Sequence, residues 1–155
     1  MACTAPRKST PCSSSKGSGR AVAERYFAPE DVERLIPRLA DSMERVMTAQ
    51  AAGRQAQEWL DAEQQRITLS GGGVIDQADW RARRERVELS TRAMQAGIEE
   101  IQSLGGVIKD LGLGLVDFPH LRDGRVVNLC WRYGERRITH WHGLDEGYAA
   151  RKPLP

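Results

Sequence analysis

The stretch RDGRVVNLCWRYGERRITHWH, residues 122–142, decides the fold class of this chain. Its apolar residues recur near every second position, which is typical of strands that bury one face. Asp123-Gly124 is a turn signal, and Gly134-Glu135 predicts a two-residue hairpin turn because glycine stands first. Together with the extended patterns of Val107–Leu111 and Leu113–Phe118, the stretch predicts a small antiparallel sheet over about 107–142 and a C-terminal loop over 143–155.

Two long amphipathic helices are expected before the sheet. Apolar residues recur at helical spacing over about 29–69 and 76–104, and Gly105-Gly106 ends the second run. Ser70–Gly73 reads as a flexible connection, so the helices should pack as an antiparallel hairpin with gentle coiled-coil geometry. Pro37 predicts a kink or a break in the first helix. The fold class is therefore α+β, a long antiparallel helical hairpin followed by a small antiparallel β-sheet.

Length and composition limit the alternatives. The chain has 155 residues and a formal net charge of +2 at pH 7, which gives no global case for binding nucleic acid. Residues 1–22 are basic and rich in Ser, Thr, Pro and Gly, so they are predicted to form a disordered tail before a single domain over 23–155. No apolar run is long enough to span a membrane. The cysteines, Cys3, Cys12 and Cys130, lack CxxC spacing and favour a reduced, cytoplasmic location.

His140 and His142 are the first candidates for chemistry. Two residues apart on a strand, they share a face and could chelate one divalent transition metal ion. A further ligand would come from Asp117, His120, Cys130, Asp145 or Glu146, and the metal hypothesis uses His140, His142, Asp117, Asp145 and Glu146. Adjacent carboxylates diverge on regular structure, which argues against a paired-carboxylate mechanism from residues 145 and 146 alone. For His140, an exposed or cross-strand packing role is the alternative.

The position of Cys130 depends on the length of the turn before the histidines. A two-residue Gly134-Glu135 turn places Cys130 opposite Thr139, on the other face of the sheet from His140 and His142. A three-residue loop would place Cys130 opposite His140 instead, because a slip by one residue exchanges the faces. Turn chemistry favours the first register, in which Cys130 is a small buried apolar residue and no ligand.

Part of the sequence resembles a known bacterial family. The segment YFAPEDVERLIPRL, followed later by KDLGLGLVDFPHLRDGRVVNLCWRYGERRITHWHGLDEGYAARKPL, resembles the family catalogued as domain of unknown function 2203. The resemblance covers roughly residues 26–154. It brings no activity, but its signature points to residues worth testing: Asp117, Arg125, Cys130, Trp131, Glu135, Trp141, His142 and Arg151. The chain has Tyr-Ala-Ala-Arg over 148–151, where the resemblance implies Gly-Phe-Ala-Gly-Arg.

Three functions are carried forward as hypotheses. The first is a small binding or interaction module with a ligand site at the sheet end, formed by Asp117, Arg125, Trp131, Glu135, Trp141, His142 and Arg151. Its ligand would be a small molecule or a protein, and the helical hairpin would serve as a scaffold or a homo-oligomer face. The second is a metal-binding protein or metal-dependent enzyme. The third, an RNA-associated protein, rests on the basic tail and on Arg81, Arg83, Arg84 and Arg86, although interleaved acids favour an ordinary solvated surface.

The sequence leaves enzymatic activity open. No nucleophile elbow, Walker loop, dinucleotide fingerprint or HExxH helix is present. The arginines Arg132, Arg136, Arg137 and Arg151 could hold a carboxylate or phosphate by bidentate hydrogen bonds, or could form ordinary surface ion pairs.

Overall fold

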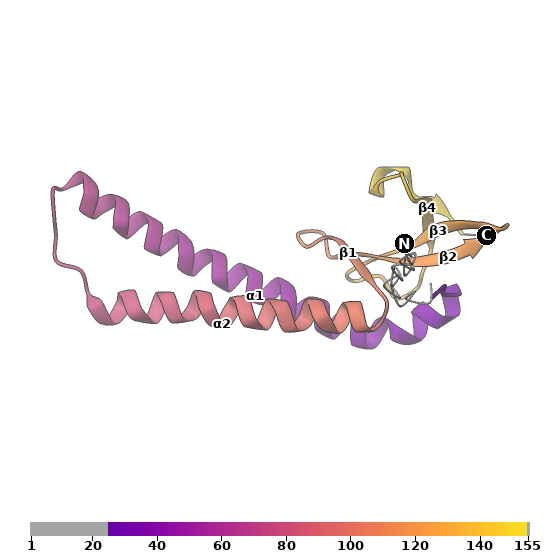
Figure 1. Ribbon diagram of the computed structural model, residues 1–155, viewed down its shortest axis with the longest axis horizontal. Coiled ribbons are helices and arrows are strands. Elements are labelled where there is room, and N and C mark those ends of the chain that lie inside the picture. Colours follow the sequence, from indigo (N-terminus) through magenta and orange to yellow (C-terminus); the bar gives the residue numbers. More distant parts are fainter. Residues whose placement is uncertain (1–24, 155) are drawn as a thin grey trace, which may run out of the picture.

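A computed structural model describes residues 25–154. A long helical hairpin extends from one end of the molecule, and a small sheet lies against the other end (Figure 1). Helix α1 spans Pro29–Leu69 and helix α2 spans Gln77–Ser103. The α+β fold class and the two predicted helices are therefore confirmed. The predicted disordered tail, residues 1–22, lies outside the described residues.

The helix ends follow the local sequence. Asp76 caps α2, because its side chain accepts hydrogen bonds from the backbone N–H groups of Ala78 and Asp79. Gly105 ends α2 with a φ of 95°, a conformation that glycine adopts without steric cost. Pro37 does not break α1, which continues through it. The first turns of α1 are set at an angle to the rest of the helix (Figure 1), as expected of a helix that contains a proline.

The sheet is fully antiparallel, with its strands in chain order β1-β2-β3-β4-β5. The strands span Val107–Asp110, Leu115–Arg122, Arg125–Arg132, His140–Gly143 and Lys152–Pro153, and a short 3-10 helix, η1, covers Tyr148–Ala150. Asp123 and Gly124 connect β2 to β3 with positive φ values of 50° and 73°, so the predicted Asp-Gly turn is confirmed.

The predicted register between β3 and β4 is wrong. Residues 133–139 connect these strands, so Gly134-Glu135 is not a two-residue hairpin turn. Cys130 lies opposite His140 rather than Thr139, and His142 lies opposite Asn128. The longer connection has a physical cause, because Glu135 turns back towards β3 and its carboxylate accepts the Arg132 backbone N–H at 2.9 Å. Cys130 therefore shares its face with His140 and His142, in the register that the turn chemistry disfavoured.

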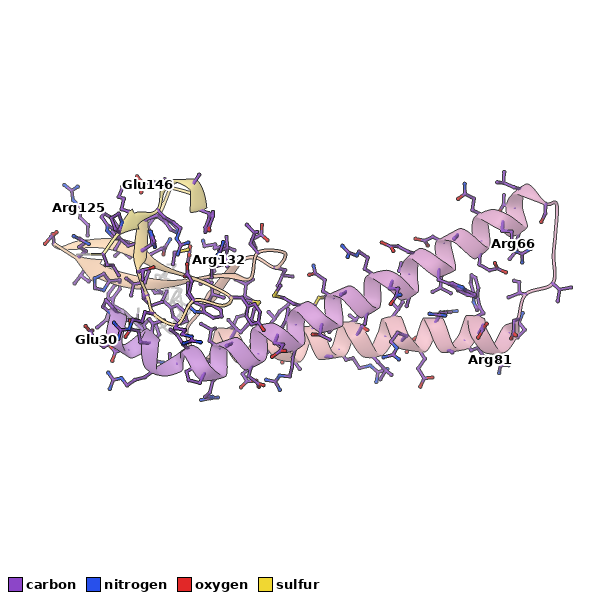
Figure 2. All side chains as sticks on the ribbon, turned by 180° about the vertical axis from the view of Figure 1, so that it is seen from behind. Glu30, Arg66, Arg81, Arg125, Arg132 and Glu146 are labelled. Carbon is purple, nitrogen blue, oxygen red and sulfur yellow. The ribbon has the colours of Figure 1, made fainter. Side chains whose placement is uncertain are left out.

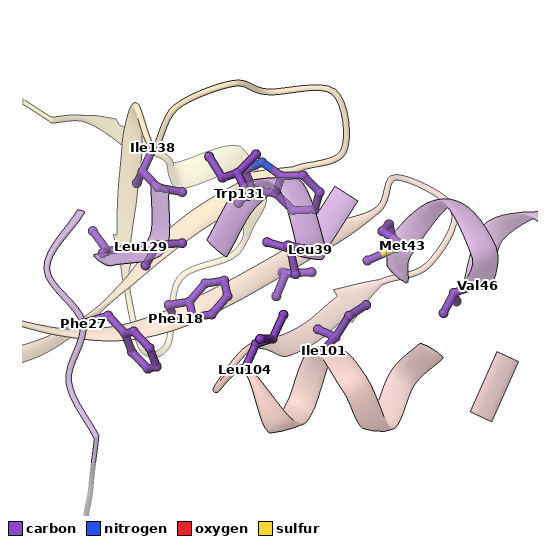
Figure 3. Packing of buried hydrophobic residues seen from close by; sticks show 13 residues of the cluster. Phe27, Leu39, Met43, Val46, Ile101, Leu104, Phe118, Leu129, Trp131 and Ile138 are labelled. Atoms are coloured by element: carbon purple, nitrogen blue, oxygen red, sulfur yellow. The ribbon is translucent and has the colours of Figure 1, made fainter. Parts of the chain in front are cut away.

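The apolar core lies between the helices and one face of the sheet. Leu39 and Met43 from α1, Ile101 from α2, and Phe118 and Trp131 from β2 and β3 are all fully buried there (Figure 3). Phe27, just before α1, packs edge-on against Phe118, with ring centroids 5.2 Å apart. This face of the sheet is thus fixed by hydrophobic burial, which is the main favourable term in folding.

The opposite face of the sheet is covered by the segment between β4 and β5. That segment, which contains η1, lies on the side of the sheet away from the helices (Figure 1). The hairpin tip, near Arg66 and Arg81, is far from the sheet, where Arg125 and Glu146 lie (Figure 2). Neither described helix combines the length and the apolar character needed to cross a bilayer.

Gly97 allows the two helices to approach closely. A Cβ at this position would clash with Val46 Cγ2 and lie 3.2 Å from the Ser42 carbonyl oxygen. We expect Gly97→Ala to lower the free energy of unfolding by about 1–3 kcal/mol through overpacking, even though alanine favours helix. Urea unfolding measures the change. Arg92→Ala, at an exposed position of α2, is the control, with an expected change within about 0.5 kcal/mol. Equal stability of the two variants would contradict the close-packing account.

Candidate metal centre

Three neighbouring strands each contribute one polar side chain to the same face of the sheet. Asp117 in β2 lies directly opposite Cys130 in β3, and His142 in β4 lies diagonally across from Cys130. Their side chains point away from the helices, because the alternate residues of β2 and β3, such as Phe118 and Trp131, face the core. The arrangement follows from strand alternation and from the two registers.

The three side chains form a compact buried cluster. One ligand atom from each residue, a carboxylate oxygen, the thiol sulfur and a ring nitrogen, lies within 4.8 Å of the others. The exposed fraction of the side chain is 2% for Asp117 and 5% for His142, and Cys130 is also buried. Buried carboxylates are costly unless paired, hydrogen-bonded or bound to metal, so Asp117 requires an explanation.

The hydrogen bond of His142 fixes which ring nitrogen faces the cluster. His142 Nδ1 lies 2.8 Å from the carbonyl oxygen of Gly143, which can only accept, so Nδ1 carries the proton. In the neutral ring, Nε2 then presents its lone pair to Asp117 Oδ2 at 3.0 Å. Two acceptors at this distance repel each other unless a proton or a cation lies between them.

The other neighbours of Asp117 are weak partners, namely the Cys130 thiol and the Lys109 ammonium. Neither carboxylate oxygen has a hydrogen bond of acceptable geometry among the described residues. The 3.0 Å contact to His142 is therefore short without being a well-aligned N–H···O bond, and the ammonium of Lys109 is 3.9 Å from Oδ2. A carboxylate with both oxygens unsatisfied beside an imidazole nitrogen is the donor set expected around a metal ion.

Cys130 is a protonated thiol in this environment. Burial, and secondly the negative charge of Asp117, raise the pKa of the Cys130 thiol to about 12. Nucleophilic cysteines have lowered pKa values, so this environment opposes a cysteine nucleophile. A bound cation would reverse the balance, because a coordinating thiol is deprotonated outright.

A small cavity adjoins the cluster. It has a volume of about 110 Å³, and its lining includes the three cluster residues. Lys109 also lines it, together with Glu146, Gly147 and Tyr148 of the β4–β5 segment. Glu146 accepts hydrogen bonds from the Gly143 N–H at 2.7 Å and from the Lys152 ammonium at 2.8 Å. These two hydrogen bonds, that from Lys152 above all, lower the pKa of Glu146.

An ion pair holds the covering segment in place. Arg151 donates to the carboxylate of Glu135 at 2.9 Å and to the carbonyl oxygen of Cys130 at 3.3 Å. The guanidinium also lies 4.8 Å from the ring centroid of Tyr148. Because Arg151 joins the β3–β4 connection, the Cys130 backbone and η1, it fixes the covering segment above the cluster. The Tyr-Ala-Ala-Arg departure is accommodated in η1, with Ala150 in regular 3-10 structure.

The sequence-predicted residues fall into separate places. Asp117 and His142 meet in the cluster, whereas His140, on the same face, directs Nδ1 to Thr139 Oγ1 at 2.8 Å and is not part of the cluster. Asp145 is exposed and Glu146 lines the cavity without joining the cluster.

The remaining predicted ligand-binding residues lie elsewhere: Trp131 in the core, Trp141 partly buried beside Arg122 and Lys152, and Arg125 exposed at the start of β3. Glu135 and Arg151 form the ion pair described above.

Sequence reasoning set aside one residue of the site and missed another. Cys130 was named as a possible ligand but was disfavoured by the wrong β3–β4 register, although the Asp123-Gly124 turn places it opposite Asp117 whatever follows. Lys109 carried no signal, because it lies at an irregularity in the β1–β2 pairing between Ile108 and Asp110. Such bulges redirect side chains and have no reliable sequence pattern.

The burial of Asp117 predicts a stability cost in the metal-free protein. We expect Asp117→Asn to raise the free energy of unfolding by about 1–2 kcal/mol in the presence of a chelator, because it removes a buried charge and offers His142 Nε2 an N–H donor. Urea unfolding measures this change. Asp145→Asn, at an exposed position, is the control and should be neutral. Lower stability of Asp117→Asn would mean that the carboxylate is held by a stabilising proton-mediated pair with His142.

Comparison with known proteins identifies the family and nothing further. A family model described as an uncharacterized conserved protein (DUF2203) matches residues 25–154. No curated protein and no solved structure matches the chain. The match covers the helical hairpin, the sheet and the Asp117–Cys130–His142 cluster, and the chain therefore belongs to the DUF2203 family.

Proposed function

We propose that this protein binds one divalent transition metal ion, with zinc as the first candidate, through Asp117, Cys130 and His142. The observation that carries the proposal is the 3.0 Å approach of His142 Nε2 to an unsatisfied, buried oxygen of Asp117, with Nδ1 committed to the Gly143 carbonyl. Metal-binding histidines commonly donate their other ring nitrogen to a backbone carbonyl in this way, which fixes the ring and the tautomer.

The donor types favour zinc or a chemically similar ion. Zinc accepts thiolate, imidazole and carboxylate ligands, whereas calcium and magnesium prefer oxygen alone. Zinc–ligand bonds of about 2.0–2.3 Å place tetrahedral ligands roughly 3.3–3.8 Å apart. The cluster atoms already lie within 4.8 Å of one another, so small side-chain movements are sufficient.

Three protein ligands beside a cavity resemble the arrangement of catalytic zinc sites more than that of structural sites, which have four protein ligands. A zinc ion here would supply Lewis acidity and lower the pKa of a bound water molecule. The protein residues would orient that ion: Arg151 fixes the Cys130 backbone, and the β4–β5 segment limits solvent access.

Zinc binding can be tested with single-atom substitutions. Untagged protein should bind one zinc ion per chain, and Asp117→Asn and Cys130→Ser should each lower the affinity by at least about a hundredfold, because each removes an anionic ligand. Isothermal titration and elemental analysis measure affinity and stoichiometry, and circular dichroism checks the fold.

The matched control is His140→Ala, on the same strand and the same face of the sheet but outside the cluster. It should bind zinc as tightly as the unchanged protein. Zinc binding that survives both ligand substitutions, or that is lost only in His140→Ala, would contradict the proposed ligand set.

Zinc binding should also release protons. Since the pKa of Cys130 is raised to about 12, the thiol is protonated at neutral pH and must lose its proton to coordinate. We expect at least one proton released per zinc ion, and an apparent association constant that falls about tenfold for each unit that the pH is lowered below neutrality. Titration calorimetry in buffers of different ionisation enthalpy counts the protons, and the count should fall in Cys130→Ser. An unchanged count in that variant would remove Cys130 as a ligand.

The other functional hypotheses stay predictions. The hairpin bears an apolar groove lined partly by Ala49, Ala52, Leu89 and Gly97, which is compatible with self-association. Of the arginines behind the RNA hypothesis, Arg83 lies 5.3 Å from the ring centroid of Trp59, and Arg86 lines the same groove.

A further inference from the structure

We propose that the metal ion held by Asp117, Cys130 and His142 takes a small anion as its exchangeable ligand, and that Lys109 recognises the charge of that anion. The inference rests on the metal site proposed above and adds the chemical class of its ligand. It is carried by the size of the adjoining cavity, by the charges around it and by the position of Lys109.

The cavity limits the ligand to a few non-hydrogen atoms. Its volume of about 110 Å³ is well below the roughly 300–1,000 Å³ of pockets for drug-sized ligands. Gly147 and Tyr148 line it on one side, and the Tyr148 hydroxyl accepts a hydrogen bond from Arg132 at 3.2 Å. A nucleotide or peptide does not fit within this volume, whereas azide, formate or bicarbonate does.

The charges around the cavity favour an anion. A divalent ion is neutralised by the Asp117 carboxylate and the Cys130 thiolate, while His142 contributes no charge when it coordinates as a neutral ring. Glu146 is neutralised by Lys152, which contacts both of its carboxylate oxygens at 2.8 and 2.9 Å. Among the residues that line the cavity, Lys109 is then the cationic group whose charge is not balanced. The local charge is therefore positive once metal is bound.

The backbone directs Lys109 towards this position. The β1–β2 pairing shifts between Ile108 and Asp110, so Lys109 lies at the irregularity, with its ammonium 3.9 Å from Asp117 Oδ2. That distance is long for a direct ion pair, and about half of the Lys109 side chain remains exposed. When Asp117 coordinates a metal ion, the metal balances the charge of its carboxylate, and Lys109 is then free to contact a ligand in the cavity.

Cobalt(II) provides the test, because its visible absorption reports both metal binding and any change in its ligands. Cobalt-loaded protein is titrated with azide, a small anion, and separately with imidazole, a neutral ligand. Lys109→Gln should lower the azide affinity roughly five- to tenfold, which is the effect of one partly exposed charge near the ligand. It should leave imidazole affinity unchanged and leave cobalt affinity equal or higher, since it removes a positive charge near Asp117.

Two further variants separate charge recognition from damage to the fold. Lys109→Arg keeps the positive charge and should bind azide about as tightly as the unchanged protein does. Arg54→Gln, which removes one positive charge from an exposed position on α1, should also leave the azide affinity unchanged. Cobalt binding without any azide-induced spectral change, or equal azide affinity in Lys109→Gln and the unchanged protein, would overturn the anion proposal alone. Failure of the unchanged protein to bind cobalt or zinc would overturn both proposals.

Discussion

The alternation of side chains along β2, β3 and β4 is the constraint on which the rest of the structure depends. One set of residues, including Phe118, Leu129 and Trp131, must face the helices because only that side offers an apolar core. The next residues along the same strands must then face the other way. Asp117, Cys130 and His142 are brought together by this requirement and by the strand registers. The hydrophobic core therefore positions a polar cluster with which it has no direct chemical relation.

The polar cluster has properties that oppose stability and favour function. A carboxylate, a thiol and an imidazole are buried together, and the carboxylate lacks well-aligned hydrogen bonds. Folding alone gives no reason to keep such a charge, because an apolar or amide side chain would cost less to bury. A buried cation explains the three donors with one cause. A buried carboxylate without aligned hydrogen bonds, beside a thiol and an imidazole, commonly indicates a functional site.

The covering segment makes the cluster a site rather than an open surface. The β4–β5 segment is held by the Arg151–Glu135 ion pair and by a hydrogen bond from Arg151 to the Cys130 carbonyl oxygen. Beneath this segment a cavity of about 110 Å³ adjoins the cluster. The helical hairpin extends far beyond the sheet (Figure 1), and only the sheet-proximal parts of its helices contribute to the core. Its distal part, near Arg66 and Arg81, lies far from the cluster (Figure 2).

The sequence by itself determined the two helices, the connection between them, the Asp123-Gly124 turn and the α+β class. These features depend on local causes, namely helical periodicity, an aspartate cap, glycine termination and a two-residue turn. It also placed Asp117 and His142 among the candidates, because acids and histidines are recognisable ligands. Through the Asp-Gly turn it even implied that Asp117 faces Cys130, since a two-residue turn fixes the register of the strands it joins.

Only the tertiary structure decided the register of β3 and β4, and with it the third member of the cluster. Residues 133–139 form a connection that combines the local Glu135–Arg132 hydrogen bond with distant contacts: Glu135 with Arg151, the Ile138 N–H with Glu33, and Leu154 with Thr139. A connection of that length has no turn rule to fix its register, so packing fixes it instead. The same holds for Lys109, whose position follows from a bulge. Local patterns thus gave the elements, and long-range contacts selected which side chains meet.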